Sequence, residues 1–226
     1  MIRIEQLSKS FGVKQVLKQI NLNLESGKVY GLVGENGAGK TTFFRCIAGL
    51  EHFQGNIHSE YKILKNHLGF LPTQPYFFSK ITGWEYLKLL CNARNVKESN
   101  FTEKNIFDLP LQQYAMTYST GMKKKLALTA ILLQNNDCYI LDEPFNGVDI
   151  QSNIIITEII HQLKSLGKTI LISSHIFSTL RDTCDEINLL KAGQIVKSVQ
   201  QPEFDLLEQE MKAFTIGKSI EKLDLK

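Results

Sequence analysis

Hydrophobic and polar residues alternate in two stretches near the beginning of the chain. Residues 2–7 alternate, and residues 16–24 do so with Ile20, Leu22 and Leu24 on one face. A period of two places successive side chains on opposite sides of a strand. Both stretches are therefore predicted to be half-buried strands, and we expect them to pair in an antiparallel manner.

Other short stretches are almost continuously apolar, at residues 28–33, 138–141 and 169–172. Short apolar runs predict strands that are buried on both faces. Helical spacing follows the first run, and a second helix capped by Asp149 or Ser152 is expected to reach Leu166, with Gly167 as its C′ residue. Further expected elements are short strands at 55–58 and 69–71, a helix at 177–184, a hairpin across 191–194 and an amphipathic segment at 204–214.

Residues 76–135 have a different pattern, because nothing in them alternates as strands do. Residues 82–93 have helical spacing, and residues 120–133 carry an apolar stripe of the kind that faces a core. Between them lie a polar segment and a break at Pro110. This part of the chain is therefore predicted to be a helical insertion.

Buried strands that alternate with helices predict an α/β fold with a parallel sheet. We expect a single domain over residues 1–226, whose core and N-terminal antiparallel β subdomain occupy residues 1–75 and 136–200. The inserted α-helical subdomain is 76–135, and the C-terminal tail is 201–226. Ligands of such folds bind at the carboxyl ends of the parallel strands, so the candidate chemistry is sought there.

Composition excludes several classes of protein. The 226 residues are 43% hydrophobic and 22% charged, with a net charge of +3, which gives no reason to expect nucleic-acid binding. The four cysteines form no C-x-x-C pair, and Cys46 and Cys138 are expected to be buried thiols, which fits a reducing compartment. We found neither a secretory signal nor an apolar run long enough to cross a bilayer.

A glycine-rich loop follows the first buried run. Residues 34–42 read GENGAGKTT and match G-x-x-x-x-G-K-[ST] between a predicted strand and a predicted helix. This arrangement turns backbone N–H groups toward a phosphate, with Lys40 over the β- and γ-phosphates and the Thr41 hydroxyl on Mg²⁺. The alternative, a glycine-rich turn with a chance lysine, would not explain the flanking elements. The predicted nucleotide-binding residues here are Gly34, Asn36, Gly37, Ala38, Gly39, Lys40, Thr41 and Thr42.

Two carboxylates, Asp142 and Glu143, come directly after the second buried run. Taken alone, they could be a strand that simply ends in solvated acidic residues. Downstream of a complete phosphate loop, they favour a role for Asp142 in holding Mg²⁺ and for Glu143 as the general base that activates water. We therefore predict a site for a nucleoside triphosphate and Mg²⁺ that also hydrolyses the nucleotide.

One histidine stands out from the others. His175 follows the third buried run, which should lie beside the strand that ends at Asp142. A neutral imidazole there could hydrogen-bond the γ-phosphate or the attacking water. The remaining histidines are interpreted as structural: His52, His58, His67 and His161.

With these elements in order, the chain resembles the nucleotide-binding domain of an ATP-binding cassette (ABC) transporter, to about residue 200. The resemblance implies a P-loop NTPase core of the RecA-like kind, with the glycine loop as Walker A and the strand ending in Asp142 and Glu143 as Walker B. It further implies that Gln74 is the Q-loop glutamine, a catalytic and metal-binding residue. Residues 118–122 stand at the signature motif, 146–149 at the D-loop and His175 at the switch histidine. Phe11 stands where an aromatic residue stacks on adenine.

The family implies partners as well. Two such domains pair head to tail, so Ser119 and Gly121 of one subunit would close over the phosphate loop of the other, with ATP between them. The pair is either a homodimer or formed with a sister subunit. A membrane permease would bind the helical insertion and receive the motion through the segment at Gln74. The protein would then be cytoplasmic, peripheral on the cytoplasmic face of the cell membrane.

The signature departs from the family pattern, because Thr120 replaces a glycine and Met122 replaces a glutamine. Threonine still serves at a helix N-terminus, so we expect a working site with altered geometry. The lysine run 123–125 is most simply a solvated face. However, cations in a first helical turn oppose the helix dipole, so a phosphate or an acidic partner surface would offset that cost.

Similarity to the stand-alone ATPase subunits of exporters is greater than to those of importers, which predicts an exporter motor. One alternative is a soluble ATPase of the same class that acts on ribosomes or DNA, but such proteins usually carry two cassettes or coiled-coil arms. Another is a binding-only regulatory cassette, for which losses at Glu143 or His175 would be expected. Both residues are present.

Overall fold

The computed structural model describes the backbone of residues 1–219 and side chains up to Lys212. Its strands form two sheets. The smaller sheet is antiparallel, in the order β2-β1-β4, and consists of β1 (Ile2–Phe11), β2 (Lys14–Leu24) and β4 (Gln54–Ser59). The larger sheet has the order β5-β6-β7-β3-β8-β9, with β3 (Val29–Val33), β5 (Leu68–Leu71), β6 (Cys138–Asp142), β7 (Thr169–Ser173), β8 (Glu186–Lys191) and β9 (Gln194–Gln200).

Neighbouring strands of the larger sheet from β5 to β8 are parallel, and β9 adds antiparallel to β8. The α/β fold with a parallel sheet and an antiparallel β subdomain is confirmed. In the smaller sheet, β1 runs to Phe11, further than the alternation over residues 2–7 predicted. Gln6 and Gln19 adopt positive φ angles of 51° and 49° at irregularities in the β1–β2 pairing, and these interrupt the alternation.

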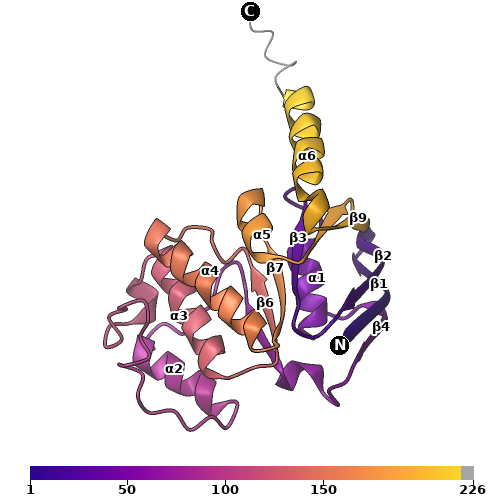
Figure 1. Cartoon of the computed structure of the whole chain (residues 1–226). Helices are drawn as coiled ribbons and strands as arrows, with labels where there is room; N and C mark the ends of the chain where they lie inside the picture. Colours follow the sequence, from indigo (N-terminus) through magenta and orange to yellow (C-terminus); the bar gives the residue numbers. More distant parts are fainter. Residues whose placement is uncertain (220–226) are drawn as a thin grey trace, which may run out of the picture.

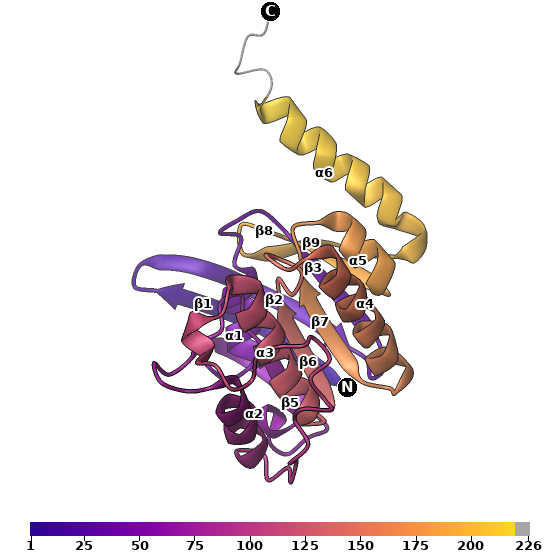
Figure 2. The same cartoon turned by 90° about the vertical axis from the view of Figure 1, so that its left-hand side faces the viewer.

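Helices cover both faces of the larger sheet (Figure 1). α1 (Lys40–Ile47) follows β3, and α4 (Ile150–Ser165) and α5 (Phe177–Thr183) flank β7 in sequence. Between β5 and β6 the chain forms α2 (Gly83–Asn92), the short 3₁₀ turn η2 (Ala115–Thr117) and α3 (Thr120–Leu133). The 3₁₀ turns η1 (Leu64–Asn66) and η3 (Gln201–Glu203) precede β5 and α6 (Phe204–Ser219), and α6 projects from the body (Figure 2).

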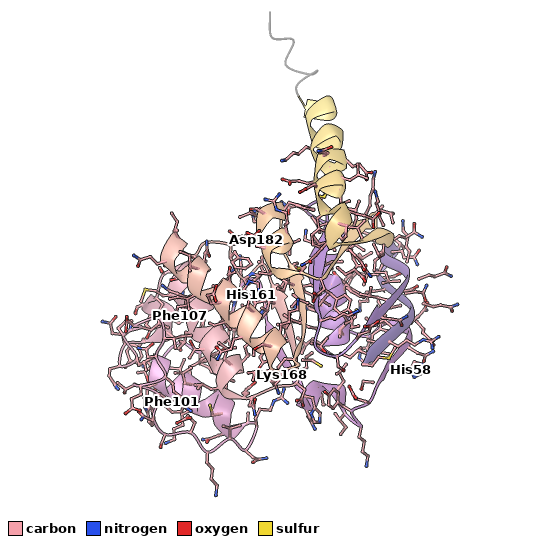
Figure 3. The ribbon with its side chains drawn as sticks, viewed as in Figure 1. His58, Phe101, Phe107, His161, Lys168 and Asp182 are labelled. Carbon is pink, nitrogen blue, oxygen red and sulfur yellow. The ribbon has the colours of Figure 1, made fainter. Side chains whose placement is uncertain are left out.

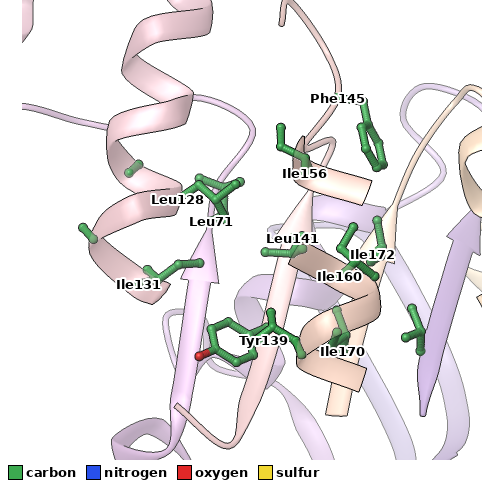
Figure 4. Packing of buried hydrophobic residues seen from close by; sticks show 14 of the residues in the cluster. Leu71, Leu128, Ile131, Tyr139, Leu141, Phe145, Ile156, Ile160, Ile170 and Ile172 are labelled. Carbon is green, nitrogen blue, oxygen red and sulfur yellow. The ribbon is translucent and has the colours of Figure 1, made fainter. Parts of the chain in front are cut away.

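The apolar runs of the central strands are explained by burial on both faces. Alternate residues of β6, Tyr139 and Leu141, belong to a core cluster shared with α3 and α4, which Figure 4 shows from close by. Cys138 and Ile140 belong instead to the cluster shared with α1 and the smaller sheet. Neither face of β6 meets water, so no polar residue interrupts the strand before Asp142.

Helix ends follow local sequence rules. Thr82 and Glu85 form a reciprocal capping box at α2, and Asp149 caps α4 by accepting from the Ser152 amide. Gly167, just beyond the last turn of α4, has a φ of 75°, as the sequence predicted for the C′ position. Within residues 1–219, no helix combines the length and apolar character needed to span a bilayer.

Candidate nucleotide-binding site

The glycine loop connects β3 to α1 at the carboxyl edge of the larger sheet. Gly39, the residue before α1, has a φ of 113°, and a Cβ there would lie 2.7 Å from the Leu17 side chain. A Cβ on Gly34 would lie 2.3 Å from the carbonyl oxygen of Leu190. Glycine is thus required at both positions, one for backbone conformation and one for close packing. The loop therefore presents the unpaired N–H groups at the start of α1 toward the cleft.

Lys40 is the first residue of α1 and is buried, with 8% of its surface exposed. Its Nζ donates to the carbonyl oxygens of Gly34 at 2.7 Å and Glu35 at 3.3 Å. The ammonium group is therefore held at the mouth of the loop by the loop's own backbone. A cation in this position offsets the negative charge of a phosphate group.

Asp142 is fully buried at the end of β6, and its carboxylate accepts hydrogen bonds from three hydroxyl groups. Thr41 and Thr73 donate to its Oδ2 at 2.7 and 2.6 Å, and Ser173 donates to its Oδ1 at 2.6 Å. These donors come from α1, from the segment after β5 and from the end of β7. The carboxylate is therefore fixed in orientation beside the first turn of α1.

The oxygen atoms around Asp142 fit a magnesium ion. Mg²⁺ takes hard oxygen ligands and is usually held by one or two carboxylates together with substrate phosphates and water. The Thr41 hydroxyl and the Asp142 carboxylate meet that requirement at one point. In the part of the chain that the structure describes, there is no group of three or more His, Cys, Asp or Glu side chains that would suit a different, all-protein metal site.

Glu143 is held on its backbone and on its side chain. Its N–H donates to the Ser173 hydroxyl at 3.0 Å, and its Oε2 lies 2.7 Å from Nδ1 of His175. The backbone N–H of His175 also donates to Oε2, at 3.3 Å. Because a carboxylate only accepts, Nδ1 carries the proton of the shorter contact. Glu143 has a φ of 54°, unusual for a residue with a side chain.

Strand pairing brings these groups together. β6 and β7 are parallel, and Asp142 pairs with Ser173 at their carboxyl ends. His175 is therefore placed next to Glu143, as the sequence predicted from adjacent buried strands. His58 and His161, labelled in Figure 3, lie on β4 and α4 and do not line the cleft.

The cleft at this edge has a volume of about 770 Å³. That size is within the usual range of small-molecule sites, roughly 300–1,000 Å³. The smaller sheet contributes one wall, with Lys14 and Lys18 adding positive charge, and the β8–β9 turn contributes Ala192 and Gly193. The predicted site residues that line the cleft are Asn36, Gly37, Gly39, Lys40, Thr41, Thr42, Asp142, Glu143 and His175.

Several predicted residues lie outside the cleft lining. Gly34 and Ala38 line the other side of the loop, in a hollow of about 450 Å³ below α6. Phe11 is 48% exposed at the end of β1, with the Lys9 ammonium 4.5 Å from its ring centroid. Gln74 is exposed, and its neighbour Thr73 is the residue that reaches Asp142. The predicted roles of Phe11 and Gln74 therefore stay predictions.

The predicted signature residues are on the same chain but away from its own cleft. Ser119 caps α3 by accepting from the Met122 amide, and it is exposed. A Cβ on Gly121 would lie 2.5 Å from the Gly147 carbonyl oxygen, so the signature packs against the predicted D-loop through glycine. Neither Ser119 nor Gly121 lines the cleft around Lys40.

The interpretation of the lysine run as a solvated face is wrong for Lys124. That side chain is 2% exposed, and burial lowers the pKa of its ammonium group. Lys125 donates to Asp149 and to Ser152, both at 3.1 Å. The Ser152 amide and hydroxyl, with Lys125, hold the pKa of Asp149 well below its usual range.

Sequence reasoning missed Thr73, Ser173 and Lys124. The first two are hydroxyl residues without a distinctive spacing, although Ser173 does end a predicted buried strand. The burial of Lys124 could have been predicted, because Lys124 lies on the same side of α3 as the buried residues Ala127 and Ile131.

Comparison with known proteins places the chain in a family. The sequence profile of the ABC transporter family matches residues 17–146. The lantibiotic transport ATP-binding protein SrtF of Streptococcus pyogenes is 31% identical over 92% of this chain and 95% of that protein. The bacitracin transport ATP-binding protein BcrA of Enterococcus faecalis is 32% identical over 96% of this chain and 75% of that protein.

Solved structures agree on the fold. An ATP-binding subunit of an ABC transporter superimposes with a TM-score of 0.80 at 26% identity, covering 93% of both chains. A dimeric ATP-binding cassette bound to ADP and Pi has the same TM-score of 0.80 at 19% identity, covering 89% of this chain and 99% of the other.

Proposed function

The chain belongs to the ABC transporter family as an ATP-binding, ATP-hydrolysing subunit, and we propose that it drives a separate membrane permease that exports its cargo. This proposal rests mainly on one observation: the phosphate-binding loop and the carboxylate–histidine pair proposed for hydrolysis lie in the same cleft. Lys40 and Thr41 stand at the loop, and the Glu143–His175 contact of 2.7 Å lies in the same cleft.

Nucleotide binding is assigned to the loop and the first turn of α1. The N–H groups at the helix N-terminus and the Lys40 ammonium would bind the β- and γ-phosphates. The oxygens of Thr41 and Asp142 would hold Mg²⁺, which, when bound, neutralises charge on the phosphate oxygens. The lysines of the cleft wall, Lys14 and Lys18, add positive potential along the rest of the nucleotide.

Hydrolysis is assigned to Glu143. A carboxylate in the cleft can accept the proton of the attacking water while the water oxygen bonds to the γ-phosphorus and the bond from that phosphorus to the β–γ bridging oxygen breaks, so that ADP leaves. His175 holds one oxygen of that carboxylate through Nδ1 and its backbone N–H, which leaves Oε1 for the water. With Nδ1 protonated, Nε2 of a neutral His175 is an acceptor and would accept a hydrogen bond from the attacking water, whereas donation to the γ-phosphate would require the imidazolium form.

A second subunit is proposed because the signature is remote from the cleft of its own chain. The exposed N-terminus of α3 offers the Ser119 hydroxyl and backbone N–H groups to an anion. A head-to-tail pair would bring this helix over the partner's glycine loop, with ATP between the subunits. A solved cassette with the same fold is dimeric, which supports pairing of two subunits.

The class of cargo is proposed from the names of two relatives. Two of them are named for lantibiotic and bacitracin transport, so we propose a peptide antibiotic as the class of cargo. The subunit would act from the cytoplasmic face of the membrane, bound to the permease. Co-purification with a hydrophobic multi-helix protein would support this proposal, whereas co-purification with ribosomes or DNA would favour a soluble ATPase.

Sedimentation of Glu143→Gln protein, with and without Mg-ATP, tests the paired arrangement. Glutamine cannot accept the water proton, so ATP stays intact between the subunits. We expect a monomer that becomes a dimer only with Mg-ATP. Lys40→Ala in the same background is the control, because it removes the phosphate-binding cation and should stay monomeric. A protein that binds ATP yet remains monomeric would contradict a homodimer and point to a sister subunit.

A further inference from the structure

The turn that carries Glu143 is held by a buried lysine from another element. Lys124 Nζ donates to the carbonyl oxygen of Glu143 at 2.6 Å and to that of Asn146 at 2.9 Å. The N–H of Asn146 also donates to the Glu143 carbonyl, at 3.2 Å, which closes the turn. The Lys124 ammonium therefore spans both ends of the turn that follows β6.

A buried cation requires an explanation, because removing an ammonium group from water is costly. The two partners of Lys124 are backbone carbonyls, and the charges of Glu143 and Asp142 act on it through space. A hydrophobic side chain would fill the same space without that cost. The lysine therefore indicates a requirement for its two hydrogen bonds at this turn.

The conformation of Glu143 indicates what the turn needs. Its φ of 54° is sparsely populated for a residue with a Cβ, and such residues persist only where their surroundings hold them. Ser173 holds the N–H side of Glu143, and Lys124 holds the carbonyl side. Rotation of either peptide would swing the carboxylate away from His175.

We propose that Lys124 is a positioning residue for ATP hydrolysis, which fixes the backbone of Glu143 so that its carboxylate faces the γ-phosphate. Lys124 is in the second turn of α3, whose N-terminus carries Ser119 and Gly121. Gly121 also packs on Gly147, so α3 and the turn after β6 form one unit. This inference rests on the proposed function, because it requires Glu143 to be the general base.

The test compares Lys124→Met and Lys124→Gln with the wild type in ATP affinity and in turnover at saturating Mg-ATP. Methionine fills the space without donors, whereas glutamine keeps an amide group that can donate twice. A misplaced reacting group can cost about 100-fold in rate, so we expect Lys124→Met to lower kcat by about 10–100-fold. Its Kd for ATP should stay within about threefold, because Lys124 does not line the cleft.

Lys168→Met is the matched control. Lys168 also has a largely buried side chain, paired with Asp137 at 3.1 Å, but it precedes β7 at the end opposite the cleft (Figure 3). Its loss should lower stability while leaving kcat within about twofold of the wild type. A loss of kcat in Lys168→Met equal to that in Lys124→Met would overturn the proposal, because the effect would then be general.

A double-mutant cycle decides whether Lys124 acts through Glu143. In the Glu143→Gln background, Lys124→Met should change residual single-turnover hydrolysis by less than about twofold, because the group it positions is gone. Three results would each overturn the proposal. The first is an equal loss of hydrolysis in both backgrounds, and the second is a kcat of Lys124→Met within about twofold of wild type. The third is a Kd for ATP that rises in step with the loss of kcat.

The test also covers an unstable Lys124→Met variant and a failure of the general-base assignment. If Lys124→Met does not unfold cooperatively, Lys124→Gln is tested in its place; because its amide keeps donors, we expect a kcat loss of about 2–10-fold with an unchanged Kd, and a kcat within about twofold of wild type would overturn the proposal. If Glu143→Gln alone hydrolyses ATP at the wild-type rate, the general-base assignment fails and the Lys124 proposal fails with it. If Glu143→Gln hydrolyses ATP slowly while Lys124→Met keeps the wild-type kcat, the Lys124 proposal is overturned and the general-base assignment stands.

Discussion

Replacing Ser173 with alanine should destabilise the protein more than any ordinary serine replacement. Ser173 is fully buried, donates to Oδ1 of Asp142 at 2.6 Å and accepts from the N–H of Glu143 at 3.0 Å. Alanine fits the same space but offers neither a donor nor an acceptor. The change therefore leaves a buried carboxylate oxygen and a buried N–H group without this partner.

The size of the effect follows from those two bonds. A hydrogen bond to a charged group contributes about 1.5–3 kcal/mol, and a buried polar group left unsatisfied costs about 1–3 kcal/mol. Asp142 keeps the hydroxyls of Thr41 and Thr73 on its other oxygen, which reduces the loss. We expect the free energy of unfolding to fall by about 2–4 kcal/mol. For a chain of this size, that corresponds to a Tm lower by about 4–16 °C.

Urea unfolding monitored by circular dichroism, with a thermal scan, measures both quantities. Ser165→Ala is the matched control, because Ser165 is exposed and donates only to the Gln162 carbonyl, at 2.8 Å. Surface changes of that kind stay within about 0.5 kcal/mol. Equal stability losses in Ser173→Ala and Ser165→Ala would refute the reasoning, because Ser173 would then not hold the Asp142–Glu143 turn.

Three further predictions concern the surroundings of the site. Gly121→Ala should lower the free energy of unfolding by about 1–3 kcal/mol, because a Cβ would lie 2.5 Å from the backbone oxygen of Gly147; an unchanged urea midpoint would contradict this. Asp149→Asn should be less stable than wild type at pH 7. The difference in unfolding free energy should narrow as pH falls below about 4, because the pKa of Asp149 is lowered in the folded state and the stability that its carboxylate contributes is lost on protonation. A stability difference as large at pH 2 as at pH 7 would count against it. The four cysteines are buried, and burial raises the pKa of Cys184 to about 12, so native protein should react slowly with a thiol reagent and all four should react in urea.

The central strands could be predicted from sequence because both of their faces are buried. The runs at 28–33, 138–141 and 169–172 contain little that is polar, and β3, β6 and β7 occupy them. The glycine loop could be predicted because its spacing is required by backbone geometry. Asp142 and Glu143 then fall beside it through the parallel pairing of β6 and β7.

Other features depend on contacts between distant residues and leave little trace in the sequence. Thr73 and Ser173 lie 69 and 31 residues from Asp142, and hydroxyl residues at strand ends are too common to be diagnostic. Lys124 stands within a run of three lysines, which predicted a solvated face, yet packing of α3 against the turn after β6 buries it. The irregularity at Gln6 likewise depends on pairing with β2 and β4, not on local alternation.

ATP affinity and turnover, measured together on Glu143→Gln and Lys40→Ala, test the account of this site most directly. Glu143→Gln should bind Mg-ATP with a Kd within about threefold of wild type while turnover falls by at least about 100-fold, because it removes the base and leaves the phosphate loop intact. Lys40→Ala should lose binding itself, since its ammonium group is the cation at the mouth of the loop. Hydrolysis by Glu143→Gln within about twofold of the wild-type rate would contradict the assignment of Glu143 as the general base.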